Sequence, residues 1–461
     1  MNIRRIISLS FTLVSIACIG CQTRSALSAE ANTDRVVVLM SVDGLANFYL
    51  QDPTVEMPAI RKLAAEGAVS AGMRASDPTV TWPNHTTLVT GVSPAHHGVV
   101  GNDYLDRTTG KKIVVIWDPT LDKEEIVKAP TIYDVAKAAG LKTAAVHWPA
   151  SRNAHSLDWT VPDCSKPELL EKYSTPAVLE ETKAAGIDLI NDADGKPRRR
   201  TESTEEDQRF LDVFKLILRE HKPNVALFHV LDVDFTEHRE GPRSGKALEA
   251  IKGADDQVRQ VWEELQKDFP GKATLIIVSD HGFSLNKTRV AIDPILEQAG
   301  LLKTVGSRIT GGDVEPVVQG GSVLLYIHDE ANRAAIEERV RKAFANVEGV
   351  AKIIVADEFK DYGIGDPKRD PHAPDMVLFA DLGYFFGDTA AGGKNELKGS
   401  HGYDSHLPDM HAVFIACGAG IKPGTKLGEI NNTDVAPTIA KLLGLEIPNA
   451  DGKPLLDALA K

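Results

Sequence analysis

The stretch RVVVLMSVDG, residues 35–44, contains the apolar run VVVLM, residues 36–40, and has a carboxylate at Asp43. Residues 35–42 carry apolar side chains on both faces and are rich in valine, which predicts a strand buried inside a sheet. Asp43 and Gly44 follow directly at the carboxyl end of that strand. Strands of this kind are typical of mostly parallel sheets that helices cover on both faces.

The same alternation of short apolar runs and amphipathic segments continues along the chain. Further strands are predicted at 143–147, 225–230, 274–279, 322–327, 376–379 and 412–416. Helices are predicted at 57–66, 131–139, 204–221, 246–268, 331–345 and 434–443. We therefore predict an α/β fold with a mostly parallel central sheet. We expect one domain, 34–461, with a surface insertion around 150–205 that carries the run Arg198-Arg199-Arg200.

The composition is that of a globular protein with an acidic balance. The 461 residues include 52 Lys and Arg and 65 Asp and Glu, so the formal net charge at pH 7 is −13. Hydrophobic residues make up 43% of the chain, which excludes a disordered protein and a disulfide scaffold. The acidic balance also argues against a nucleic-acid-binding surface, because phosphate backbones need a basic partner.

The first 28 residues are expected to form a signal peptide. Arg4 and Arg5 precede an apolar run, residues 6–19, that is too short to span a bilayer. A lipoprotein signal that ends before Cys21 is the alternative, and a lipid anchor at Cys21 would then be the only membrane contact. Both alternatives predict an exported protein, periplasmic or anchored in a bacterial envelope. Beyond the leader, Cys164 and Cys417 could pair, and the sequence leaves this open.

Acidic and imidazole side chains follow three of the predicted strands, and one more lies in a glycine-flanked loop before residues 412–416. They are Asp43, Asp234, His238, Asp280, His281 and His401. In open α/β sheets ligands bind outside the carboxyl ends of the strands, so we expect these six side chains to converge. Taken singly, each Asp is more typical of a turn and each His of a structural hydrogen bond. Taken together, they form a ligand set that suits zinc, with manganese as a substitute.

A hydroxyl nucleophile is predicted in the segment TVTWPNH, residues 79–85. Pro83 suits the first position of a helix, which places Thr81 or Trp82 at the helix cap. A hydroxyl there faces free N–H groups and the positive end of the helix dipole, where anions bind. Taken alone, this segment favours plain N-capping by Thr81. An aliphatic hydroxyl also needs a base or a metal to ionise it.

Several short motifs occur along the chain in one order. They are SVDG (41–44), TWPNHTTLVTG (81–91), HG (97–98) with Asn102, DxxxH (234–238), DHG (280–282) and HGYD (401–404). Together they resemble the type I phosphodiesterase/nucleotide pyrophosphatase branch of the alkaline phosphatase superfamily. The resemblance extends over residues 35–456 and implies an alkaline-phosphatase-like three-layer α/β/α sandwich.

The resemblance also implies a site with two zinc ions, or Mn²⁺ in their place. One ion would contact the Thr81 oxygen and be held by Asp43, Asp280 and His281. The other would be held by Asp234, His238 and His401. Such a pair of ions clamps the attacking and leaving oxygens of a phosphoryl transfer.

The remaining implied roles concern the substrate, a small phosphodiester or nucleotide. Thr81 would attack phosphorus to give a phosphothreonine intermediate, while Asn102 and the backbone N–H of Trp82 would bind a phosphoryl oxygen. The Trp82 side chain could stack on a base. A second aromatic residue usually lies five residues before Asp234, and this chain has His229 there, so the base clamp is only half built.

Two alternatives remain open. A phosphomonoesterase or phosphonate hydrolase on the same scaffold is the nearer one. Monoesterases of this superfamily usually add Arg, Lys or a third metal; none lies in the motifs above, although residues 150–205 could supply one. A non-catalytic envelope protein that keeps its metal cage for stability is the more distant alternative.

Overall fold

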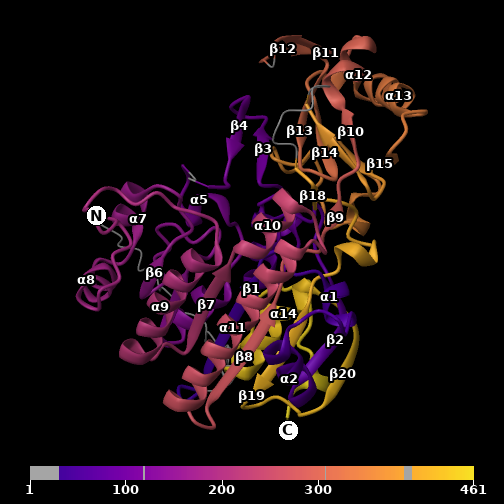
Figure 1. Ribbon diagram of the computed structural model, residues 1–461. Coiled ribbons are helices and arrows are strands. Elements are labelled where there is room, and N and C mark those ends of the chain that lie inside the picture. The colour runs from indigo at the N-terminus through magenta and orange to yellow at the C-terminus, as the bar shows by residue number, and fades with distance from the viewer. Residues whose placement is uncertain (1–30, 118–119, 307, 389–396, 461) are drawn as a thin grey trace, which may run out of the picture.

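The computed structural model describes residues 31–117, 120–306, 308–388 and 397–460. Its largest element is an eight-stranded sheet in the order β20-β2-β19-β8-β1-β7-β5-β6 (Figure 1). These strands are β1 Val36–Val42, β2 Ala68–Arg74, β5 Thr143–Val146, β6 Trp159–Val161, β7 Val225–Val230, β8 Ala273–Val278, β19 Phe414–Gly418 and β20 Thr425–Asn431. All neighbours pair in parallel except β19, which is antiparallel to β2 and β8. The mostly parallel central sheet is therefore confirmed.

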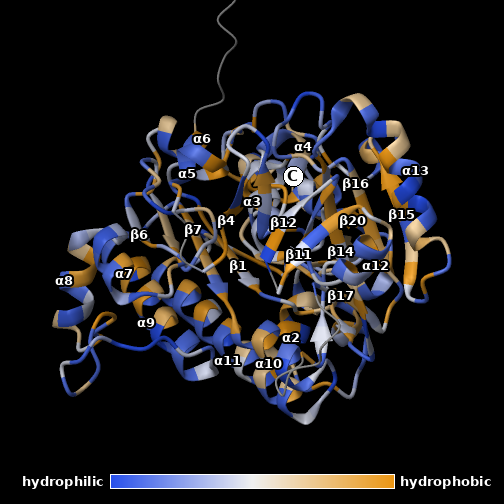
Figure 2. Cartoon of the chain, turned by 90° about the horizontal axis from the view of Figure 1, so that it is seen from above, coloured by the Kyte–Doolittle hydropathy of each residue, from blue (hydrophilic) through white to orange (hydrophobic). Residues whose placement is uncertain are grey.

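Helices cover both faces of this sheet, as Figure 2 shows from above. One face packs against α2 Pro58–Glu66, α8 Pro176–Ala184, α9 Thr204–His221 and α11 Gly245–Asp268. The other face packs against α3 Thr81–Thr90, α6 Ile132–Ala138 and α14 Val435–Leu442. Side chains of β1 alternate between the two cores, Val38 and Met40 in the first, Val37 and Leu39 in the second. This alternation explains the two-sided apolar run, and the three-layer α/β/α sandwich is confirmed.

A second, antiparallel sheet has the order β13-β14-β16-β15 (Figure 1). Its strands are β13 Val314–Val318, β14 Ser322–Ile327, β15 Val350–Val355 and β16 Met376–Ala380. Helices α12 Ile292–Gln298 and α13 Arg333–Phe344 share a core with one face of this sheet, and the other face shares a core with Trp82. The expectation that 322–327 and 376–379 continue the parallel sheet is wrong, because an apolar run predicts burial but not the partner strand.

The other described elements are short. Two-stranded sheets pair β3 Asp103–Asp106 with β4 Lys111–Val114, β9 Ser284–Leu285 with β18 Gly399–Ser400, β10 Thr288–Ala291 with β17 Tyr384–Gly387, and β11 Leu302–Val305 with β12 Arg308–Gly312. Further helices are α1 Asn47–Gln51, α4 Pro94–His97, α5 Lys123–Ile126, α7 Pro167–Tyr173 and α10 Asp232–Glu240. The segment expected as an insertion, 150–205, contributes the edge strand β6 to the main sheet as well as α7 and α8.

The described residues bear only in part on the predictions about the leader, the membrane and the cysteines. The predicted leader, residues 1–28, lies outside the described residues. Within the described ranges, every helix is too short or too polar to cross a membrane. Cys417 on β19 is a buried free thiol in the part of the chain that the structure covers.

Candidate active site

Three neighbouring strands bring most of the predicted site residues to one edge of the sheet. Strands β8, β1 and β7 are adjacent and parallel, so Asp280, Asp43 and the start of α10 follow at the same carboxyl edge. His401 comes from a distant part of the chain, through the pairing of β18 with β9 that places its loop beside the one after His281. A cavity of about 350 Å³ opens here, and its lining includes Asp43, Thr81, Asn102, Asp234, His238 and His401.

Asp43, Asp280 and His281 form the first group of close ligand atoms, which lie within 4.8 Å of one another. His281 Nε2 is 3.4 Å from Asp43 Oδ1 and 3.2 Å from Asp280 Oδ2. The His281 ring is turned this way because its Nδ1 faces the backbone carbonyl of Gly282 at 3.1 Å. The other Asp280 oxygen accepts the N–H of Gly44 at 3.1 Å, which fixes that carboxylate.

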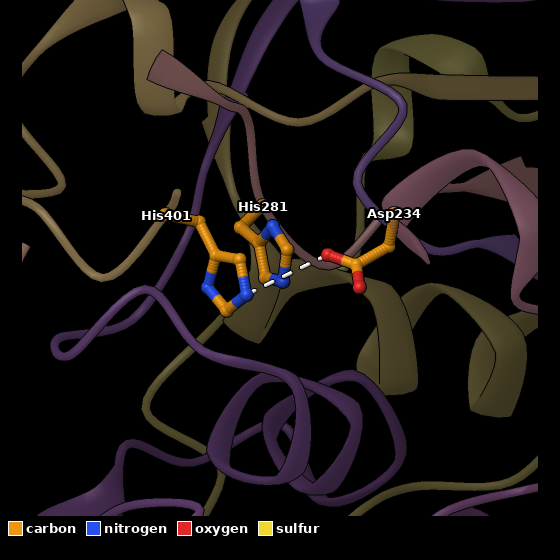
Figure 3. Close-up of side chains that lie close together, drawn as sticks. All are labelled: Asp234, His281 and His401. Atoms are coloured by element: carbon orange, nitrogen blue, oxygen red, sulfur yellow. Dashed lines mark ion pairs between the residues drawn. The ribbon is translucent and has the colours of Figure 1, made fainter. Parts of the chain in front are cut away.

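The second group is centred on Asp234. Its Oδ1 lies 3.5 Å from Nε2 of both His238 and His401. Each of these rings is held through Nδ1 by a backbone carbonyl at 2.9 Å. The His281 ring stacks on His401 with centroids 3.7 Å apart, and its ligand atom is also within 4.8 Å of those of Asp234 and His401 (Figure 3). His281 therefore stands between the two groups.

Four buried ligand atoms in these groups have no hydrogen-bond partner: Asp43 Oδ1, Asp234 Oδ1, Asp280 Oδ2 and His281 Nε2. Unpaired polar atoms of this kind are costly to bury. Burial raises the pKa of all three carboxyls, and neighbouring carboxylates raise the pKa of Asp43 and Asp280 further. Divalent cations held by the two groups would satisfy these atoms and offset the clustered negative charge, so the donor set fits a metal site of carboxylates and imidazoles.

Thr81 is the first residue of α3. The helix has Val80 as its N-cap, so the expectation that Thr81 or Trp82 caps it and that Pro83 is its first residue is wrong. Proline is tolerated throughout the first turn because the N–H groups there have no partner within the helix. The Thr81 side chain makes no capping bond, and the residue is 7% exposed and lines the cavity.

Asn84 holds the loop that leads into Thr81, and we did not single it out from the sequence. Its side-chain oxygen accepts the N–H of Ser76 at 2.7 Å. Its amide donates to the carbonyls of Val80 at 2.8 Å and Pro78 at 3.2 Å. The sequence does contain one indication of this role. Asn84 lies inside the first helical turn, where asparagine cannot act as the N-cap and its side chain is free to bond to nearby backbone groups.

Asn102 lies beside the first turn of α3. Its Oδ1 accepts the backbone N–H of Trp82 at 3.0 Å, so the two groups expected to bind one phosphoryl oxygen bond to each other here. The Asn102 backbone N–H in turn donates to Gln319 Oε1 at 3.0 Å. The Trp82 side chain is only 1% exposed and packs in the core below the second sheet, which leaves little of its indole for stacking.

His229 is fully buried behind Asp43. Its Nε2 is 3.0 Å from Asp43 Oδ2, and its Nδ1 is 3.1 Å from the backbone carbonyl of His147. The carbonyl of His147 can only accept a hydrogen bond, so Nδ1 of His229 carries a proton. A hydrogen bond between His229 Nε2 and Asp43 then requires a second proton, on either His229 or Asp43. The ring also packs on His85 with centroids 4.1 Å apart. This geometry favours support of the Asp43 carboxylate over stacking on a substrate.

A third group of ligand-type side chains contains Asp77, Asp404 and His406. Asp77 accepts hydrogen bonds from the N–H of Ser405 at 2.9 Å and from its hydroxyl at 2.5 Å. Asp404 accepts bonds from Lys352 and from the backbone N–H of His406. These internal bonds account for the group without a metal.

Asp77 gives a prediction for the pH dependence of stability. Burial raises its pKa to about 7, above the ordinary 3.8, so the folded state keeps a proton that the unfolded chain releases. The stabilisation is complete below about pH 4 and is lost as the pH rises to about 7. Asp77→Asn resembles the protonated form, so we expect it to gain stability over the wild type across this window, by about 4 kcal/mol at most. Thermal unfolding of both proteins from pH 4 to 8 measures this, and a difference in Tm that does not grow with pH contradicts it.

The chain is similar to one known protein family and to several characterised proteins. The family model described as type I phosphodiesterase/nucleotide pyrophosphatase matches residues 37–404. Ectonucleotide pyrophosphatase/phosphodiesterase family member 3 of Rattus norvegicus is 24% identical over 92% of this chain and 44% of its own length. The venom phosphodiesterase of Macrovipera lebetinus is 24% identical over 96% of this chain and 47% of its own length. The chain thus spans about half the length of these relatives.

Solved structures with the same fold were also found. Human ectonucleotide pyrophosphatase/phosphodiesterase 5 superposes with a TM-score of 0.67 at 21% identity, over 93% of this chain and all of that one. The murine protein, as an inactive threonine-to-alanine variant in complex with AMP, has a TM-score of 0.67 at 20% identity, over 92% of this chain and all of that one. At these identities the likeness establishes a shared fold.

Proposed function

The chain belongs to the type I phosphodiesterase/nucleotide pyrophosphatase family, and from this premise we propose that it hydrolyses phosphodiester or nucleotide pyrophosphate bonds through a phosphothreonine intermediate on Thr81. The observation that carries the proposal is a shared cavity. Thr81 lines the same cavity of about 350 Å³ as Asp43 and Asp234, whose Oδ1 atoms are buried without hydrogen-bond partners. The proposed nucleophile and the proposed cation site therefore share one cavity.

We assign the metal ligands to two positions. One position, which includes the Thr81 oxygen, would be held by Asp43, Asp280 and His281. The other would be held by Asp234, His238 and His401. Zinc is the preferred ion for these carboxylates and imidazoles, and Mn²⁺ is the substitute. When bound, two such ions supply positive charge at the attacking and leaving oxygens and make the hydroxyl easier to ionise.

The bond changes all occur at Thr81 and the substrate phosphorus. Thr81 Oγ1 loses its proton and bonds to phosphorus, while the bond from phosphorus to the leaving oxygen breaks and that oxygen takes up a proton. Water then bonds to phosphorus and the Thr81–phosphorus bond breaks. Thr81 recovers its proton and the phosphate product leaves.

Neighbouring residues orient these groups. The Asn102 amide is proposed to donate to a non-bridging phosphoryl oxygen, and the first-turn N–H groups of α3 favour the same negative charge. Of the two residues expected to bind substrate, Trp82 is proposed to contact the ester arm where it lines the cavity. His229 is proposed instead to position Asp43, because it contacts that carboxylate directly.

We also propose that the protein is exported, to a periplasm or an envelope surface, where it acts on small phosphodiesters or nucleotides. The predicted leader supports this, and a lipid at Cys21 would provide its membrane contact. The acidic net charge of −13 supports a small substrate over a nucleic acid.

The reaction class is tested by comparing two substrates of the purified, zinc-loaded enzyme. Discrimination between two substrates is given by the ratio of their kcat/KM values. We expect kcat/KM for bis-p-nitrophenyl phosphate to exceed that for p-nitrophenyl phosphate by roughly tenfold or more. A strong preference for the monoester would replace the proposal with the monoesterase alternative. Absence of turnover of either ester, with zinc bound, would favour the non-catalytic alternative.

A further inference from the structure

One buried arginine in the cavity wall takes no part in the proposed chemistry. Arg200 lines the cavity together with Thr81 and Asn102, and its side chain is only 6% exposed. It is the last residue of the run 198–200, in which Arg199 is exposed. Arginine side chains are rarely buried to this extent unless a partner group compensates the charge, because burial of a charge is costly.

The polar contacts of Arg200 leave part of its guanidinium unsatisfied. Nη1 donates to Asp163 Oδ1 at 3.0 Å, and the Asp163 side chain is itself only 9% exposed. The Nε of Arg200 is buried and has no hydrogen-bond partner. A guanidinium offers five N–H donors in a planar fork, so one carboxylate oxygen does not complete its coordination.

The pair shares its cavity with the proposed metal ligands. Asp163 and Arg200 line it together with Asp43. His229, which contacts the Asp43 carboxylate, lines the same cavity.

The other charged residues of this wall are more exposed. Arg239 is exposed and Glu202 is half-buried, and both also line the cavity. Arg239 Nη2 donates to the backbone carbonyl of Glu202 at 3.5 Å. Together, Arg200, Arg239, Asp163 and Glu202 carry no net charge. Arg200 differs from Arg239 because its side chain is buried and its Nε has no hydrogen-bond partner. A cavity of about 350 Å³ also falls within the range of about 300–1,000 Å³ that holds whole small ligands.

We propose that Arg200 binds a second phosphate group of the substrate, separate from the phosphate that Thr81 attacks. This inference rests on the proposed function and narrows its substrate class to phosphate esters with an additional phosphate. The planar fork of arginine matches phosphate oxygens in a bidentate manner, which lysine does not reproduce. The second phosphate could lie on the arm that is retained or on the leaving group, and both sources present the same chemistry to Arg200.

The test compares three thymidine substrates in the wild type and in Arg200→Gln. The reference is the p-nitrophenyl ester of thymidine 5′-phosphate, which has one phosphate. The second substrate is the same ester with a 3′-phosphate on the retained arm, and the third is thymidine 5′-diphosphate, which has its second phosphate on the leaving group. We expect Arg200→Gln to lower kcat/KM for one of the two bisphosphorylated substrates by roughly 10- to 100-fold and the reference by less than about threefold. The affected substrate identifies the arm.

Two variants separate recognition from structural support. Arg199→Gln is the matched control in the same run and should leave all three kcat/KM values unchanged. Arg200→Lys keeps the charge, so it should recover part of the lost kcat/KM, mainly through KM. Equal losses on all three substrates, or no loss on either bisphosphorylated one, would overturn the inference. Lack of turnover of the reference ester by the wild type would instead overturn the proposed function.

Discussion

Thr81→Ala is expected to lower kcat for bis-p-nitrophenyl phosphate by about 10⁴-fold or more, the scale seen when a catalytic nucleophile is removed. The alanine has no oxygen to bond to phosphorus, and no neighbouring side chain takes that position in the proposed reaction. The six proposed carboxylate and imidazole ligands remain in place, so KM and metal content should change little. Steady-state kinetics together with metal analysis of the purified variant measure both.

The structure indicates that this variant will fold. The N-cap of α3 is Val80, and Thr81 makes no capping bond, so its hydroxyl is not needed to begin the helix. The Tm of Thr81→Ala should therefore stay close to that of the wild type. Thr81→Ser is the matched control, since it keeps a hydroxyl and should keep measurable turnover. Hydrolysis by Thr81→Ala at the wild-type rate, after contaminating phosphatase has been removed, would refute the mechanism.

The fold was largely predictable because its strands and helices are strongly patterned. The helix predicted at 204–221 agrees with the observed Thr204–His221, where Ser203 caps the first turn and one face is buried. Residues 322–327 do form a strand, but in the second sheet. Strand pairing depends on contacts between distant segments, which a local apolar pattern does not encode.

The site was predictable to the extent that strand ends define it. Asp43 and Asp280 follow adjacent parallel strands, so their convergence follows from the sheet itself. The contact of His229 with Asp43 depends on a side-chain orientation that no spacing shows. The pairing of Arg200 with Asp163 joins residues 37 positions apart, in a segment without a recognisable motif. Such long-range polar contacts appear only once the chain is folded.

Removal of divalent metal is expected to abolish hydrolysis and to lower stability, and added zinc should restore both. The reason lies in the four buried ligand atoms that have no hydrogen-bond partner, on Asp43, Asp234, Asp280 and His281. A ligand that binds only the folded state at 1,000 times its Kd stabilises that state by about 4 kcal/mol. We therefore expect zinc to raise the Tm of the EDTA-treated protein by several degrees. Thermal unfolding, metal analysis and diester hydrolysis are measured on the same sample.

Paired variants locate this effect in the proposed site. Asp280→Asn keeps the shape of the side chain but weakens one ligand, so it should reduce the zinc content and the zinc-dependent gain in Tm together. Asp404→Asn is the matched control, because Asp404 belongs to the third group, where Lys352 and His406 already bond to it. The control should bind zinc as the wild type does. If metal-free protein keeps its activity, or if both variants lose zinc equally, then the buried carboxylates at the strand ends are not what holds the metal.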